Sequence, residues 1–122
     1  MKYPITAKRL RDAMEAMNLT AQELADKSGV GKSSISHYVN GNNEPLRKNA
    51  KAMAKVLNVD TMYLMGFDEK TIEENQKQRR IQVLMRYLNS LTPQQLKTAS
   101  AVIKAIAEEN GINLESIEEP EE

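Results

Sequence analysis

The spacing of apolar residues along the first half of the chain predicts a series of short amphipathic helices. Apolar residues recur at intervals of three and four positions in two segments, which predicts helices over about residues 5–17 and 46–57. The inward face of the first contains Ile5, Leu10, Ala13, Met14 and Met17, and that of the second contains Leu46, Ala50, Met53, Ala54 and Leu57. Asn18 and Asn58 are expected stops, and a last short turn runs from Asp60 to Gly66.

Two more short helices are predicted between these segments, on either side of a turn. Thr20 and Glu23 have the spacing of a capping box, in which each residue's side chain accepts a hydrogen bond from the other's backbone N–H. This helix is expected to end at Ser28-Gly29, because glycine readily takes the left-handed conformation of a sharp turn.

The second helix of the pair is predicted over about residues 32–39, with Gly31 as its N-cap. Ile35 and either Tyr38 or Val39 are expected to point inward, and the residues from Asn40 to Pro45 form a loop by composition. Five helices within about 66 residues predict a compact bundle.

The second half of the chain has the pattern of a helical hairpin. Residues 67–71 are predicted to be a linker and 72–110 a hairpin, with Thr92 as N-cap and Pro93 at the first position of its second helix. Each arm has one apolar stripe, and two arms alone bury little surface, so the stripes need a partner, either the first half of the chain or another subunit. We assign them to dimerisation. The stripes contain Ile81, Leu84, Leu88 and Leu91 in one arm and Leu96, Ala99, Ile103 and Ile106 in the other. Residues 111–122 form an acidic tail.

Composition narrows the possible functions. The chain has no Cys and a single His, which excludes disulfides, thiolate metal sites and a site made of several histidines. There is no catalytic nucleophile paired with a base and no phosphate-binding glycine loop, so we expect no enzyme and no cofactor. No run of about 18 apolar residues predicts a membrane span, and the first residues contain no apolar signal segment, so a cytoplasmic location is expected.

The formal net charge is zero, but the charges are unevenly distributed. Residues 1–66 contain ten Lys and Arg against six Asp and Glu, or plus four, and residues 67–122 contain seven against eleven, or minus four. A basic front half followed by an acidic back half is typical of a DNA-contacting domain joined to a second module, although chance unevenness would give the same totals.

The segment from Thr20 to Gly41, TAQELADKSGVGKSSISHYVNG, combines these features into one motif. Small Ala25 allows close helix crossing, Gly29 permits the turn and Ile35 fixes the second helix on the core, which leaves the outer face of that helix rigidly presented. The segment resembles the helix-turn-helix of the phage lambda repressor and Cro class, the XRE family, and LRKNAKAMAKVLNVDTMYLMG resembles the closing helices of that family. The resemblance covers about residues 5–66 and implies an all-α, five-helix repressor-like DNA-binding bundle followed by the hairpin.

The resemblance also implies which residues meet DNA. A helix fits the major groove, where each base pair presents a distinct pattern of donors and acceptors. The family's groove-facing positions correspond to Lys32, Ser33, Ser36 and His37, with Ser34 nearby. Expected phosphate contacts are Gln22, Tyr38, Asn40, Asn43, Lys48 and Lys51, with Arg9 and Arg11 as further positive charge.

Two positions in this assignment differ from the family or have a second interpretation. The family commonly opens the first helix of the motif with Gln, whereas this chain has Ala21 there and Gln22 one position later. Tyr38 fits a core residue as well as it fits a phosphate contact.

The implied function is a transcriptional repressor that binds a palindromic operator in double-stranded DNA as a homodimer. The alternative is an antitoxin or phage-immunity protein, in which the hairpin binds a toxin or antirepressor protein and DNA binding is secondary.

Overall fold

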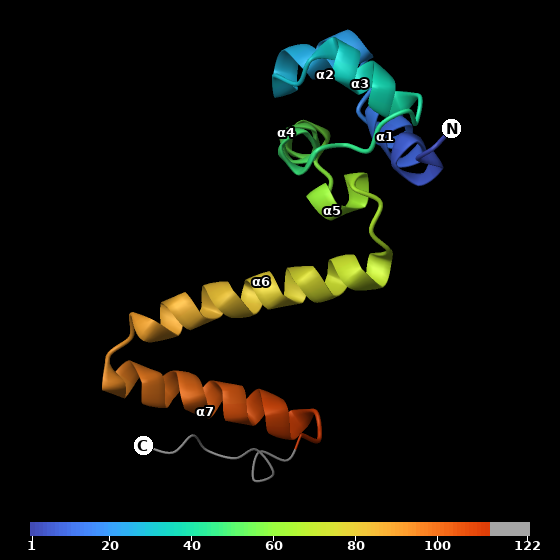
Figure 1. Ribbon diagram of the computed structural model, residues 1–122. Coiled ribbons are helices and arrows are strands. Elements are labelled where there is room, and N and C mark those ends of the chain that lie inside the picture. The colour runs from blue at the N-terminus through green and yellow to red at the C-terminus, as the bar shows by residue number, and fades with distance from the viewer. Residues whose placement is uncertain (113–122) are drawn as a thin grey trace. The chain divides into compact units, whose positions relative to one another are not determined.

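The computed structural model describes residues 1–112 and is built of seven α-helices in that range (Figure 1). The distal part of the predicted acidic tail, residues 113–122, lies outside the described residues. Among residues 1–112 there is no β-strand, so the predicted all-α class is confirmed. The helices are α1 (Pro4–Ala16), α2 (Ala21–Ser28), α3 (Lys32–Val39), α4 (Arg47–Leu57), α5 (Thr61–Leu64), α6 (Glu69–Asn89) and α7 (Pro93–Glu109). The chain divides into two compact units, Met1–Lys77 and the part from Gln78 onward.

The core of the first unit is built from all of its first five helices, which Figure 1 shows gathered together. The largest fully buried side chains are one from each helix, namely Leu10, Leu24, Ile35, Met53 and Leu64. Burying each such side chain stabilises the fold by about 1.5–3 kcal/mol. These helices are short, and tertiary packing of this kind is what keeps short helices folded.

Local signals set most of the helix ends, as the sequence predicts. The Thr20 hydroxyl accepts a hydrogen bond from the Glu23 backbone N–H at 3.1 Å, and Glu23 Oε1 accepts one from the Thr20 N–H at 3.1 Å. The predicted capping box is therefore present. Gly29 ends α2 in the left-handed conformation, with φ of 79°, and Asn18 and Asn58 also have positive φ.

Three side chains that helical spacing places in the core lie elsewhere. Ile5 is 58% exposed, Met17 is 45% exposed and Leu46 is 67% exposed. Met17 and Leu46 lie just outside the helical spans, as the C-cap of α1 and the N-cap of α4. A residue at a cap position no longer follows the helical angle, so its spacing does not predict its direction.

The predicted linker over 67–71 differs from the structure at its second half. Asp68 Oδ1 accepts a hydrogen bond from the Thr71 backbone N–H at 2.7 Å, which is the geometry of an N-terminal cap, and α6 begins at Glu69. The first unit accordingly includes residues up to Lys77.

In the second unit, the last part of α6 and all of α7 are joined at residues 90–92. The Thr92 hydroxyl and the Gln95 side chain form the second capping box, and Pro93 is the first helical residue. The predicted hairpin connection therefore has the expected local structure. Most apolar side chains of the two arms nevertheless remain exposed, including Leu84 at 56%, Ile103 at 53% and Ile106 at 55%.

Candidate nucleic-acid interface

The geometry of the site is that of two short helices joined by a tight turn, α2 and α3, with residues 29–31 between them. The Ser28 hydroxyl donates to the Leu24 carbonyl at 2.6 Å and accepts from the Val30 N–H at 3.1 Å. Val30 itself is buried in the core. The turn is thus held by hydrogen bonds on one side and by apolar packing on the other.

The inner side of α3 fixes this helix on the bundle. Ile35 is fully buried and Tyr38 is 4% exposed, and both belong to the main core cluster. Two buried anchors three residues apart occupy one side of an eight-residue helix, which leaves the opposite side to solvent.

The outer side of α3 contains the four residues predicted to contact bases. Lys32, Ser33, Ser36 and His37 are all exposed. Positions 32 and 36, and 33 and 37, are one helical turn apart, so the four side chains form one continuous face. Within residues 1–112 no hydrogen bond or ion pair engages these side chains, and the donors and acceptors of this face are free to meet a ligand.

The predicted phosphate contacts surround this face, and most of them are exposed. Asn40 and Asn43 lie in the segment that follows α3, and Lys48 and Lys51 lie on the first half of α4. Gln22 is exposed on α2, but its Nε2 donates to Asp26 Oδ1 at 2.9 Å. The second N–H of this amide remains available as a donor to phosphate.

Tyr38 is a core residue, which is one of the two interpretations that the sequence leaves open. Its ring is buried and its hydroxyl accepts a hydrogen bond from Asn49 Nδ2 at 2.8 Å. The side chain therefore joins α3 to α4, and phosphate contact by Tyr38 stays a prediction. Asn49 was not singled out by the sequence, because nothing in a single Asn on a helix indicates its partner.

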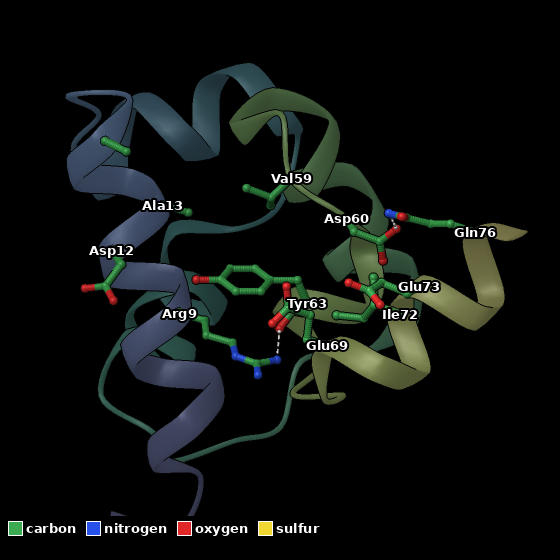
Figure 2. A pocket seen from close by; sticks show the side chains of 11 residues that line it. Arg9, Asp12, Ala13, Val59, Asp60, Tyr63, Glu69, Ile72, Glu73 and Gln76 are labelled. Carbon is green, nitrogen blue, oxygen red and sulfur yellow. Dashed lines mark hydrogen bonds between the residues drawn. The ribbon is translucent and has the colours of Figure 1, made fainter.

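The two arginines of α1 have structural roles that the sequence did not indicate. Arg9 Nη1 donates to the Tyr63 carbonyl at 2.9 Å and to the Phe67 carbonyl at 2.5 Å, and its guanidinium lies 4.7 Å from the centroid of the Tyr63 ring. Figure 2 shows Arg9 and Tyr63 facing one another across the gap between their helices. Arg11 Nη1 donates to the Val39 carbonyl at 2.7 Å, at the end of α3.

A cavity of about 700 Å³ lies beside the Arg9–Tyr63 contact (Figure 2). Ala13 and Val59 are among the residues that line it, together with four carboxylates, those of Asp12, Asp60, Glu69 and Glu73. Asp12 already pairs with Lys8 at 2.7 Å. Asp60 accepts hydrogen bonds from the Met62 N–H at 2.7 Å and from Gln76 Nε2 at 3.2 Å. This acidic cavity does not include any residue of the α3 face.

Three exposed charged groups in the first unit have shifted pKa values. The backbone N–H and then the side chain of Thr20 hold the pKa of the Glu23 carboxyl below its usual value. The Thr71 backbone N–H does the same for the pKa of Asp68, whereas the hydrogen bond to Asp12 raises the pKa of Lys8. Each of these shifts comes from a local cap or ion pair away from the outer side of α3.

Among residues 1–112 no three His, Cys, Asp or Glu side chains lie so that they could hold a metal ion together. No helix in the same range is long and apolar enough to cross a membrane.

Comparison with known proteins shows similarity over the first half of the chain. The family model for the helix-turn-helix, HTH_3, matches residues 10–64. The HTH-type transcriptional regulator ImmR of Bacillus subtilis (strain 168) is 32% identical over 62 residues, which are 51% of this chain and 49% of ImmR. The chain thus spans about half the length of this curated relative.

Two solved structures are also similar. The restriction-modification controller protein C.AhdI from Aeromonas hydrophila has a TM-score of 0.46 and 25% identity, covering 48% of this chain and 89% of that one. A chain of the SinR protein/SinI protein complex has a TM-score of 0.48 and 17% identity, covering 84% of this chain and 97% of that one.

Proposed function

We propose that the chain is a DNA-binding transcriptional regulator, because residues 10–64 match the family model for the helix-turn-helix. More specifically, it is a sequence-specific repressor that binds a palindromic operator as a dimer. The observation that carries the proposal is the outer face of α3, where Lys32, Ser33, Ser36 and His37 are exposed and unengaged within the described residues. No residue is assigned a catalytic role.

The chemistry of this face suits base edges in the major groove. The Lys32 ammonium can donate to guanine O6 and N7, and the serine hydroxyls can donate or accept. The buried anchors Ile35 and Tyr38 keep the helix from rolling, so these groups are presented in a fixed arrangement. A fixed arrangement of donors and acceptors is what distinguishes one base sequence from another.

The surroundings of α3 suit the DNA backbone. Asn40, Asn43, Lys48 and Lys51 are exposed on the segments that follow α3, and Gln22 is exposed on α2. Contacts of such residues with phosphates fix the register of the protein on the duplex without reading sequence. The excess of four positive charges in residues 1–66 favours the same partner.

Dimerisation is assigned to the second unit because most side chains of its apolar stripes are exposed. Each exposed residue on or next to a stripe has on the order of 100 Å² of side-chain surface accessible to solvent. Together these areas approach the roughly 800 Å² that each partner buries in a stable interface. These side chains are Ile81, Leu84, Met85, Leu96, Val102, Ile103 and Ile106. Leu88, Leu91 and Ala99, the remaining stripe residues, are half-buried. A second copy of the chain offers the same stripes and is the simplest occupant.

Two joined copies would place two α3 helices on one duplex. In this protein class, half-sites lie about one helical turn apart, roughly 34 Å, so the operator is a palindrome. A dimer bound at a promoter represses transcription by blocking the polymerase.

The exposed stripes also favour a second candidate function. An antitoxin or phage-immunity protein would use the same apolar arms to bind a toxin or antirepressor protein, with DNA binding secondary. The two functions differ in what they require of α3, because only the repressor needs its outer face to read a sequence.

The first test is selection of duplexes from a random library by the full chain at near-physiological salt. We expect an enriched palindrome, and Lys32→Ala should weaken binding to it by about 1–3 kcal/mol and relax the preference at one position. Salt-sensitive binding without enrichment would contradict sequence-specific repression and favour the protein-binding alternative. An equal loss on all sequences with Lys32→Ala would make Lys32 a phosphate contact.

The second test removes the hairpin at the boundary between the units. A chain that ends at Lys77 keeps the whole first unit, so it should fold but remain monomeric and bind the operator more weakly. Sedimentation equilibrium measures the first expectation, and a gel-shift titration measures the second. A dimeric truncated chain would contradict the assignment of dimerisation to the hairpin.

A further inference from the structure

The C-terminal end of α3 is held by side chains from two other helices. From α1, Arg11 Nη1 donates to the Val39 carbonyl at 2.7 Å. From α4, Asn49 Nδ2 donates to the Tyr38 hydroxyl at 2.8 Å. Among residues 1–112 no side chain of another helix hydrogen-bonds to residues 31–34, so the side-chain hydrogen bonds that hold α3 lie at the end away from Lys32.

The contact of Arg11 matters because α3 is short. The helix has eight residues, and the carbonyls of its last turn have no intrahelical donor. Backbone N–H groups of Asn40, Gly41 and Asn42 donate to the carbonyls of Ser36, Tyr38 and His37. Among residues 1–112 no backbone N–H donates to the Val39 carbonyl, and Arg11 supplies that donor.

The charge of Arg11 adds to the effect of this hydrogen bond. The C-terminus of a helix has a partial negative charge, and a cation placed there is stabilising. A hydrogen bond between a guanidinium and a carbonyl is also stronger than a bond between neutral groups. Both contributions oppose fraying of the turn that contains Ser36 and His37.

We infer that Arg11 is a positioning residue for sequence readout, which sets how the outer face of α3 meets the base edges. The inference rests on the proposed function, since readout requires DNA binding. Arg11 acts through the Val39 carbonyl from the side of α1, and Asn49 acts through Tyr38 from the side of α4. The two contacts limit both rolling and tilting of the helix.

A simpler role for the exposed Arg11 would be direct contact with a DNA phosphate, and the two roles give different results. A lost phosphate contact weakens binding about equally on all sequences and lowers the slope of log affinity against log salt by about one. A lost positioning contact weakens binding to the operator selectively and leaves the slope unchanged.

The experiment compares Arg11→Met with Lys8→Met in the full chain. Lys8 is an exposed cation on the same helix, so its substitution removes the same charge without touching α3. For Arg11→Met we expect about tenfold weaker binding to the selected operator, a change of less than about twofold on a scrambled duplex, and an unchanged salt slope. Lys8→Met should leave the ratio of the two affinities unchanged. Equal losses on both duplexes for Arg11→Met would overturn the inference.

A second measurement does not depend on DNA. Amide hydrogen exchange of Asn40, Gly41 and Asn42 in the free protein reports opening of the end of α3, because these N–H groups bond to its last carbonyls. We expect exchange about tenfold faster in Arg11→Met and unchanged in Lys8→Met. Unchanged exchange in both variants would overturn the positioning role even if an operator is found. If the wild-type chain selects no operator, the proposed function fails, while faster exchange would still show that Arg11 holds α3.

Discussion

Replacing both Ile103 and Ile106 by Ala should separate dimerisation from folding. Both residues lie on the exposed stripe of α7, and they are 53% and 55% exposed. Ala has a higher helix propensity than Ile, so α7 itself should not be weakened. The substitution therefore removes apolar surface that only a partner would cover.

The size of the effect follows from the exposed fraction. Each Ile→Ala change removes three carbon atoms, which are worth about 0.8 kcal/mol each when fully buried. About half of that burial remains to be gained on association, or roughly 1.2 kcal/mol per side chain. Two side chains in each of two copies give about 5 kcal/mol per dimer, which corresponds to an increase of roughly 10³- to 10⁴-fold in the dimer Kd.

The dimer Kd is measured by sedimentation equilibrium, and folding is followed by circular dichroism. The matched control is Lys97→Ala with Lys104→Ala, two exposed residues on the other side of the same helix. The control should leave the Kd within a few fold of the wild type. If the Ile variant dimerises as tightly as the control, the stripe is not the dimer interface, and the reasoning from exposed apolar area is refuted.

Three further predictions concern the first unit. Ile35→Ala should lower the free energy of unfolding by about 2–5 kcal/mol in urea titrations, because Ile35 is fully buried. Gly41→Ala should cost at least about 1–2 kcal/mol, because φ is 69° and the new Cβ would meet the Met1 side chain and lie 3.2 Å from the Tyr3 carbonyl oxygen. Gly31→Ala, with nothing nearer than 3.9 Å, is its control. The lowered pKa of Glu23 adds stability that is present above the ordinary Glu pKa of about 4.3 and is lost as pH falls through the lower folded value. Glu23→Gln should therefore show a smaller decrease in melting temperature between about pH 5 and pH 3, and an unchanged decrease would argue against the capping box as its source.

Local interactions explain what could be predicted from the sequence. A capping box needs only residues three positions apart, so Thr20 with Glu23 and Thr92 with Gln95 define the starts of α2 and α7 without reference to the rest of the chain. The left-handed conformation of Gly29 is likewise a property of one residue. The packing of α2 against α3 could also be predicted, because it depends on a small side chain at Ala25 and a branched one at Ile35.

Helical spacing was less informative at the ends of helices. Leu46 fits the apolar period of α4 but is its N-cap and is 67% exposed. The prediction of a linker did not consider Asp68, whose side chain accepts a hydrogen bond from the Thr71 backbone N–H, so that α6 begins at Glu69. In both places a single backbone or capping geometry decides the outcome, and the period of apolar residues contains no information about it.

The sequence by itself determined the helices, the turn between α2 and α3 and the outward direction of Lys32, Ser33, Ser36 and His37, because each depends on residues within one or two turns. Only the tertiary structure decided the roles of Arg9, Arg11 and Tyr38. Arg9 bonds to a carbonyl 54 positions away, Arg11 to one 28 positions away, and the Tyr38 hydroxyl to a side chain 11 positions away. Partners so distant in sequence meet only after the core has packed, and any backbone carbonyl brought near a guanidinium by that packing can accept its hydrogen bond.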